Sequence, residues 1–225
     1  AYENADAVVF QSNFNKKLTE YWFGNHSNSY VIHNAPDMKM IQRANPRFFD
    51  KKFGVNTEVW SCAASWRPHK RLKDNIRYFL ENAPQDAVFA IAGALSMDEA
   101  KEVMSINKRI FLMGDLDYMS LLSLYRRSSK FIHLAYLDHC PNVVVDAQAA
   151  GCHVVCSSSG GTPEIVRSGT VIEESPWDFK PLKLYKPPPI DFSNYASLYS
   201  DQCEDNKPNI VNCSQAYYNV FRSII

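Results

Sequence analysis

The sequence predicts an α/β protein built on a doubly wound, Rossmann-like parallel sheet. Between residues 57 and 166, short apolar runs alternate with segments whose apolar residues recur at helical spacing. The apolar runs are continuous rather than alternating, which is typical of parallel strands buried on both faces. Polar and glycine-containing turns follow these runs. In open α/β sheets ligands bind at that edge, so we expect a ligand cleft along the carboxyl ends of the strands.

Length, charge and hydropathy argue against several classes of protein. The chain has 225 residues, enough for one large or two small domains, and its 24 basic and 24 acidic residues balance to zero net charge. No whole-molecule field therefore favours nucleic acid or an anionic membrane. No apolar run approaches the roughly 18 residues that a transmembrane segment needs, and no signal peptide precedes the first strand. The first residue is Ala1 and it lies close to a strand, so we expect a fragment of a longer protein.

The six cysteines form no CxxC pair and no zinc-like spacing with histidine. Several lie in or beside apolar runs, where a free cysteine behaves as a small apolar residue. We therefore expect a reduced, cytoplasmic chain without a metal site, and leave open a peripheral membrane association of the full-length protein. In an exported protein, Cys203 and Cys213 could instead form a disulfide.

The first part of the chain predicts a strand at residues 7–10 and a helix that Ser12 can cap. A second short strand is expected at residues 30–32. Residues 37–55 show no clear period, and we interpret them as a connector with at most one helical turn. The apolar face of the first helix would consist of Phe14, Leu18, Tyr21 and Trp22.

The main block follows, and its strands and helices alternate. After residue 172 this alternation ends. An extended wrapping segment is expected over residues 175–209, because they contain Pro181, three consecutive prolines at 187–189, and Pro208. Strands are expected at residues 59–64, 87–92, 110–113, 131–136 and from 154, and helices at 72–82, 97–104, from 117 and at 143–150. A closing helix is expected at residues 210–225, with Val211, Ala216, Tyr217, Val220 and Phe221 as its apolar stripe.

The first candidate site is the basic turn between the strand at 59–64 and the next helix. Arg67, His69, Lys70 and Arg71 crowd a strand end and a helix start, and both positions favour anions. The functional interpretation is a clamp for a diphosphate. A solvated basic helix start is the competing interpretation.

The second candidate is a pair of aspartates. Asp146 lies inside an otherwise apolar helix, on the same face as Asn142. A buried carboxylate needs a partner, and vicinal ribose hydroxyls would supply two donors. Hydrogen bonds from neighbouring backbone or serine groups would also satisfy Asp146. Asp138 follows the preceding strand and would face the cleft.

The third candidate is the turn Gly160-Gly161-Thr162, which follows the strand that begins at residue 154. Paired glycines let backbone approach a ligand closely, and their N–H groups can bind an oxyanion. Glycine pairs also simply make turns. The chain contains no P-loop and no GxGxxG fingerprint.

With these sites in place, the chain resembles the C-terminal, donor-binding half of a GT-B glycosyltransferase of the large retaining family 4 (glycosyl transferases group 1). The basic turn SWRPHKRLKD resembles that family's diphosphate-binding turn. The stretch DHCPNVVVD-AQAAG-CHVVCSSS-GGTPEIV resembles its pattern of two glutamates eight positions apart, a small-residue helix, a strand and GG-x-x-E-I-V. Aspartate stands at both acidic positions, and Arg71 replaces the glycine that commonly follows the clamp lysine.

The resemblance implies a role for each site. Arg67 and Lys70 would hold the diphosphate, Asp138 would face the transferred sugar, and Asp146 would bind the ribose. The remaining donor-binding positions would be backbone near Asn142 and Val143, the turn Gly160-Gly161-Thr162, and the base-binding turn around Gly114.

The resemblance also implies a domain layout. Residues 1–50 would be the end of an N-terminal domain and the interdomain crossover, and residues 51–174 the nucleotide-sugar-binding domain. Residues 175–225 would be a proline-rich wrapping segment and a closing helix. Most of the N-terminal domain would be missing.

The resulting expectation is a retaining hexosyltransferase that needs no metal or other cofactor, although this fragment alone could be inactive. The donor would be a nucleotide diphosphate sugar, and the acceptor a hydroxyl group of a glycan, lipid or protein. The alternatives are a nucleotide-sugar-binding module without turnover, and a sugar-nucleotide epimerase on the same fold.

Overall fold

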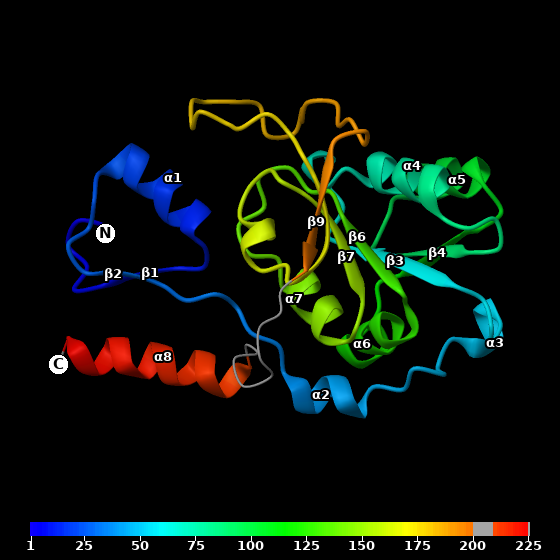
Figure 1. The fold of residues 1–225 in the computed structure, drawn as a ribbon, viewed down its shortest axis with the longest axis horizontal. Helices are drawn as coiled ribbons and strands as arrows, with labels where there is room; N and C mark the ends of the chain where they lie inside the picture. The colour runs from blue at the N-terminus through cyan, green and yellow to red at the C-terminus, as the bar shows by residue number, and fades with distance from the viewer. Residues whose placement is uncertain (200–208, 225) are drawn as a thin grey trace.

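The main sheet is doubly wound. The computed structural model describes residues 1–199 and 209–224, and its main sheet has seven strands in the order β5-β4-β3-β6-β7-β8-β9. Figure 1 labels β3, β4, β6, β7 and β9 of this sheet. Six strands are parallel, and the order reverses direction between β3 and β6. The parallel strands are β3 (Val59–Ala63), β4 (Val88–Ala92), β5 (Ile110–Gly114), β6 (Lys130–His133), β7 (His153–Ser157) and β8 (Ser168–Ile172). The predicted fold class is confirmed.

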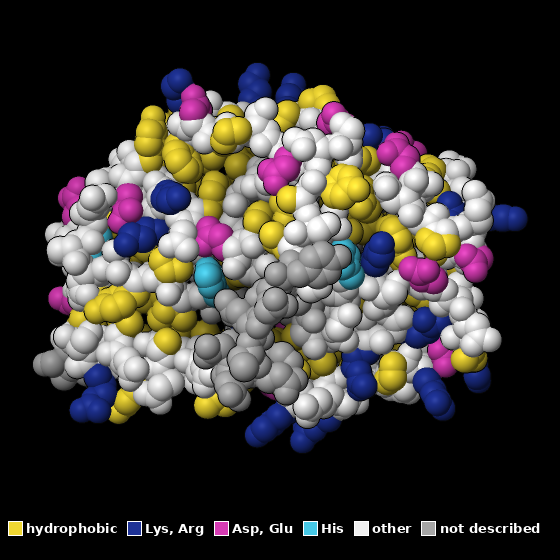
Figure 2. Space-filling model, viewed as in Figure 1, with side chains coloured by type: hydrophobic (Ala, Val, Ile, Leu, Met, Phe, Trp, Pro, Cys, Tyr) yellow, Lys and Arg dark blue, Asp and Glu magenta, His cyan; other side chains and the backbone are white. Residues whose placement is uncertain are grey.

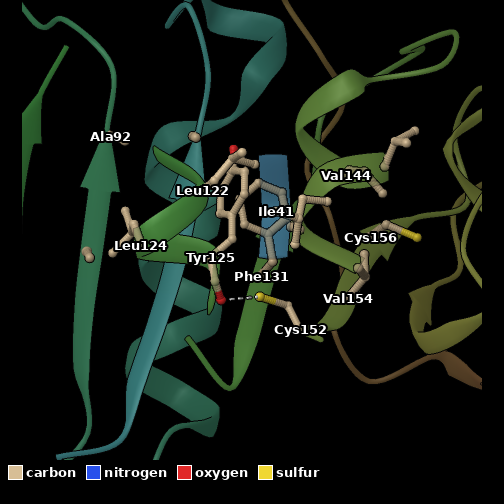
Figure 3. Close-up of a cluster of buried hydrophobic side chains, with 14 of the residues drawn as sticks. Ile41, Ala92, Leu122, Leu124, Tyr125, Phe131, Val144, Cys152, Val154 and Cys156 are labelled. Carbon is tan, nitrogen blue, oxygen red and sulfur yellow. Dashed lines mark hydrogen bonds between the residues drawn. The ribbon is translucent and has the colours of Figure 1, made fainter. Parts of the chain in front are cut away.

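Helices cover both faces of this sheet, as the continuous apolar strands indicate. Side chains of β3 alternate between the two layers: Val59 and Ala63 pack with the helices of one face, Trp60 and Cys62 with those of the other. Figure 3 shows part of the first layer, where Leu122, Tyr125 and Val144 surround Phe131. The first face is covered by α2 (Met38–Arg43), α6 (Tyr118–Arg127) and α7 (Asn142–Ala149), and the second by α4 (Leu72–Asn82) and α5 (Met97–Ile106).

Local capping explains where these helices begin. The side chain of Asp117 accepts a hydrogen bond from the Ser120 N–H at the start of α6. Ser96 and Glu99 form a capping box at the start of α5. The expected helix 72–82 and α4 coincide, and α7 begins after Pro141 as expected. Strand β6 is shorter than expected because the chain leaves the sheet after His133.

The expectation for residues 37–55 is wrong. Residues 37–55 contain α2 and α3 (Asp50–Phe53), not a connector with one turn. The Asp37 carboxylate caps α2, and buried Ile41 anchors it to the core, but helices this short leave no visible period.

Between residues 175 and 199 the chain has little regular structure, as expected, apart from one strand. This strand, β9 (Tyr195–Tyr199), pairs antiparallel with β8, so the sheet is mixed rather than entirely parallel. Residues 200–208 of the expected wrapping segment, including Cys203, lie outside the described residues.

The two ends of the chain form a separate small unit. Strands β1 (Val8–Phe10) and β2 (Ser29–Val31) pair in parallel, with α1 (Asn13–Phe23) between them in sequence. Helix α8 (Ile210–Ser223) runs beside them in Figure 1, and its Ile210 N–H donates to Pro36 O at 3.2 Å.

These elements match the expected ones, but their apolar side chains are largely exposed to solvent. No residue of α1 is buried, and Tyr21 is 54% exposed. In α8, Val220 is buried whereas Val211 and Phe221 are exposed. No helix among residues 1–199 and 209–224 is long and apolar enough to cross a bilayer.

Candidate functional site

The basic turn after β3 lies at the point where the strand order reverses, because β3 pairs with both β4 and β6. A 3₁₀ turn, η1 (Pro68–Lys70), leads into α4. Arg67 is exposed at the start of this turn. The Lys70 ammonium turns toward the loop after β6, where its Nζ lies 2.5 Å from Oδ2 of Asp138.

Asp138 is held by three groups. Besides Lys70, the His133 ring donates from Nε2 to Oδ2 at 2.9 Å, and the N–H of His139 donates to Oδ1 at 3.0 Å. Burial raises the pKa of this carboxyl, but the hydrogen bond and charge of His133 and the charge of Lys70 outweigh burial and hold the pKa well below its usual value. Asp138 is therefore ionised throughout the physiological pH range.

His133 is a site residue that the sequence did not single out as functional. It lies on β6, with its side chain 4% exposed and five positions before Asp138. Histidine at the end of a buried strand is as often packed as functional, and only the fold of the 134–138 loop brings the two side chains together.

Asp146 has a different environment. It is buried on α7, and the phenol of Tyr118 donates to its Oδ2 at 3.3 Å. Burial raises the pKa of Asp146 to about 6, with Asp37 adding to the rise and the Tyr118 hydrogen bond opposing it. Within the described part of the chain, no Lys, Arg or His forms an ion pair with it.

The N-terminus of α7 is tied to the crossover that follows β2. The amide of Asn34 donates to Asn142 Oδ1 at 2.7 Å and to Cys140 O at 3.1 Å. The first turn of α7 has no side-chain cap, so the helix dipole places positive potential at Asn142 and Val143.

The glycine turn packs against the Asp138 loop. The Gly161 N–H donates to Asp138 O at 2.7 Å, and a Cβ on Gly160 would lie 2.4 Å from the same oxygen. A Cβ on Gly161 would lie 2.1 Å from His139 O. The close approach that these glycines permit is thus to the chain itself. The Thr162 hydroxyl is buried and has no hydrogen-bond partner among the described residues.

Gly114 ends β5 with a positive φ of 64° and is exposed. It lies two strands from β3, about 10 Å along the same edge of the sheet. The structure therefore places Lys70, Asp138 and the glycine turn together, with Gly114 further along the edge.

Arg71 does not join the other basic residues. Its backbone is left-handed (φ 54°), the conformation that favours glycine, and its side chain is only 1% exposed. The guanidinium forms a bidentate pair with Glu174, with both N–O distances at 2.7 Å, and donates to Pro188 O at 2.9 Å.

Arg71 thereby anchors residues 174–192, which we call the strap. The ring of Tyr185 in the strap stacks on His69 with centroids 5.3 Å apart. Arg77 of α4 donates to Ile190 O at 2.7 Å and lies over the ring of Phe192. The sequence did not indicate these contacts, because the paired residues are more than a hundred positions apart in the chain.

Glu164 is a second residue whose role only the fold shows. Its carboxylate accepts from the backbone N–H groups of Asn13 and Phe14, each at 2.7 Å. It therefore caps α1 and joins the N-terminal unit to the glycine turn.

The fold and the site together define the class of protein. A doubly wound sheet with cationic and acidic side chains at the reversal of strand order is a nucleotide-binding type of α/β structure, and here it has the GT-B arrangement. The chain belongs to the glycosyl transferases group 1 family, whose model matches residues 47–178.

Several solved structures share this fold. HepE of Anabaena, solved in complex with UDP-glucose, is 19% identical with a TM-score of 0.64, over 78% of this chain and 51% of that one. Sucrose-phosphate synthase from Thermosynechococcus elongatus is 17% identical with a TM-score of 0.60, over 79% of this chain and 47% of that one. A glycosyltransferase from Rickettsia africae is 19% identical with a TM-score of 0.60, over 74% and 49%.

The chain thus spans about half the length of these structures. No curated protein sequence matches it. Among the described residues, no group of three or more His, Cys, Asp or Glu side chains is arranged to hold a metal ion.

Proposed function

We propose that this chain is the donor-binding half of a glycosyltransferase that moves a sugar from a nucleotide diphosphate sugar to a hydroxyl acceptor, with retention of anomeric configuration. The observation that carries the proposal is the meeting of Lys70 and Asp138 at the reversal of strand order between β3 and β6. The family match and the UDP-glucose bound to HepE support it.

Arg67 and Lys70 are the proposed diphosphate ligands. Negative charge grows on the departing diphosphate as the glycosidic bond breaks, and preorganised cations stabilise it most at that point. Exposed Arg67 and the amide groups at Asn142 and Val143 would approach the phosphates from two sides. The departing phosphate would take the acceptor proton, so the chain need not supply a general base.

The two aspartates would contact two other parts of the donor, the ribose and the transferred sugar. Asp146 would accept hydrogen bonds from the ribose hydroxyls, which suits a buried carboxylate whose side-chain donor in the described part of the chain, Tyr118, lies 3.3 Å away. Asp138 would face the transferred sugar. Aspartate is one methylene shorter than glutamate, so the sugar would lie closer or be contacted through water.

The remaining candidates would shape the pocket. Gly160, Gly161 and Thr162 would fix the Asp138 loop against the ligand, and backbone near Gly114 would contact the base. Because Arg67, Lys70 and the α7 N-terminus supply positive charge, we propose that no divalent metal is required. The full-length protein would include an N-terminal domain. The buried, unpaired Cys62, Cys140, Cys152 and Cys156 favour a cytoplasmic location.

Calorimetric titration with UDP, GDP and ADP tests donor binding. At least one nucleotide should bind, and Lys70→Ala should weaken it by about tenfold or more. Lys73→Ala is the matched control, since Lys73 is on the same helix start but 77% exposed and paired with Glu102. Absence of binding, or binding unchanged in Lys70→Ala, would remove the clamp assignment.

Turnover separates the candidate functions. A chain joined to an N-terminal half should transfer sugar or hydrolyse the donor with retention, as NMR of the anomeric proton would report. Binding without either reaction would favour a nucleotide-sugar-binding module. Interconversion of the free donor without acceptor would favour an epimerase.

A further inference from the structure

A cavity lies beside the proposed donor site. Its volume is about 440 Å³, and four parts of the chain line it: the start of α1, the loop after β6, the loop after β7, and the stretch from Glu173 to Phe179. Leu137 and Gly160 line it, and both adjoin Asp138, since Leu137 precedes it and Gly160 pairs with it in a β-bridge. The cavity therefore shares a wall with the proposed sugar site.

Aromatic rings form one side of this cavity. The Trp177 and Phe179 centroids are 5.3 Å apart, and Phe14 of α1 lies 6.3 Å and 6.2 Å from them. Hydrophobic side chains gather over α1 and the strap in the upper left of Figure 2, with charged side chains between them.

The local backbone holds these rings in place. The Trp177 indole N–H donates to Lys180 O at 3.0 Å, which fixes the plane of that ring. Phe179 has a positive φ of 61°. A bulky residue rarely adopts this conformation, and such strain concentrates at functional sites.

The charges around the cavity are mainly acidic. Glu164, Glu173 and Glu174 line it against the single cation Lys17. Glu164 is engaged with α1, and Glu174 with Arg71. Glu173 is exposed, and no described Lys, Arg or His forms an ion pair with it. The lining therefore carries a net negative charge, which favours a ligand with hydroxyl donors over a phosphate.

We infer that this cavity binds an uncharged saccharide, and that the saccharide is the acceptor. A pyranose ring presents C–H groups that pack on aromatic faces, while its hydroxyls donate to carboxylates such as Glu173. The volume lies in the range of pockets that hold small ligands of this size. The acceptor assignment rests on the proposed transferase function. The saccharide site itself does not.

The test is saturation-transfer NMR and calorimetry of the whole chain with maltose, cellobiose, lactose and diacetylchitobiose. At least one disaccharide should bind, and UDP should not displace it. Trp177→Ala and Glu173→Gln should each weaken binding by about tenfold or more, whereas Trp22→Ala, which changes a half-exposed ring on α1 outside the cavity, should not.

Glu173→Gln should fold as the wild type does, because an exposed side chain that forms no ion pair with a described residue contributes little to stability. It therefore separates loss of binding from loss of folding. If none of the four disaccharides binds, or if both cavity variants bind as the wild type does, the inference is overturned and the rings serve only to pack α1 on the strap. UDP is titrated in parallel. Saccharide binding with no nucleotide binding would count against the proposed function and leave the saccharide site standing.

Discussion

The Lys70 ammonium and the Asp138 carboxylate lie 2.5 Å apart, although 67 residues separate them in the chain. β3 and β6 are neighbours in the sheet, and each carries one of the two residues in the loop that follows it. The cation proposed for the diphosphate is thus already balanced by an anion. A donor phosphate must compete with Asp138 for Lys70.

Removing that anion should strengthen nucleotide binding. Asp138→Asn keeps the shape of the side chain but frees Lys70, so UDP affinity should rise several-fold, from about 1 kcal/mol of removed repulsion. Any transfer activity should fall in the same variant. Calorimetry with UDP measures the first effect. Weakening of UDP binding to the extent seen in Lys70→Ala would show that Asp138 supports the phosphate site instead of competing for it.

Acid stability should depend on the same pair. The folded pKa of Asp138 lies below the unfolded value of about 3.9, so its contribution to stability is present above that pH and is lost as pH falls through the folded pKa. Lys70→Met removes a cause of the lowering, and the midpoint of acid unfolding should move to higher pH. Circular dichroism against pH measures it. The control Lys73→Met should leave the midpoint in place.

Ionisation of Asp146 should affect stability in the opposite direction from ionisation of Asp138. Burial raises its folded pKa to about 6, so the ionised carboxylate destabilises the fold progressively as pH rises from about 4 to above 6. Asp146→Asn should therefore raise the melting temperature at pH 7.5 and change it little at pH 4.5. Differential scanning fluorimetry at the two pH values measures this. Equal shifts at both would mean that ionisation is not the cause.

Asp146→Asn should also weaken binding of the donor. UDP-glucose is the suitable ligand, because its diphosphate has no proton to lose in this range. Its affinity for the wild-type chain should rise between pH 5 and pH 7.5 as Asp146 ionises. In Asp146→Asn, that rise should vanish and affinity at pH 7.5 should fall by about tenfold. A preserved pH dependence would assign the titration to another group.

Arg71 should be the main anchor of the strap. Removing the guanidinium leaves Glu174 buried without a cation, which costs about 3–5 kcal/mol. Arg71→Ala should lose roughly 1 kcal/mol more than Arg71→Gly, since glycine tolerates the left-handed backbone. Urea unfolding measures both. Arg71→Gly combined with Glu174→Gln should recover part of the loss, and no recovery would mean that Glu174 is not the group left unpaired.

Glu164 should hold α1 to the sheet. Glu164→Ala removes the acceptor for the N–H groups of Asn13 and Phe14, a loss of about 1 kcal/mol. Hydrogen exchange should accelerate over residues 13–23 and stay unchanged in α4. Glu20→Ala, which removes a surface pair with Lys16, is the control. Unchanged exchange in α1 would show that other contacts fix its start.

Local signals predicted most of the elements. Asp117 and Ser12 each marked a helix start, because a capping side chain acts within three residues. No such local signal marks β9, whose five residues become a strand only beside β8. The two helices at residues 37–55 were missed for a related reason. They are held by burial of residues such as Ile41 and not by a repeating pattern.

The candidate site was predicted as a set of residues but not as an arrangement. Lys70 and Asp138 were both expected at strand ends, and the reversal of strand order brings them into contact. Arg71 was grouped with the basic turn, yet its side chain points to the strap. The glycines at 160 and 161 were expected beside a ligand, and their close approach is to the backbone of Asp138 and His139.

Local sequence patterns were enough to predict the class of this protein. Apolar runs set the strands, capping residues set the helices, and polar turns at the strand ends marked the ligand edge, since each depends on residues a few positions apart. Which charged side chains pair with one another depends on the folded chain. The partners of Arg71, Asp138 and Glu164 lie far along the chain, and an ion pair forms where folding buries two groups together, whatever their separation in sequence.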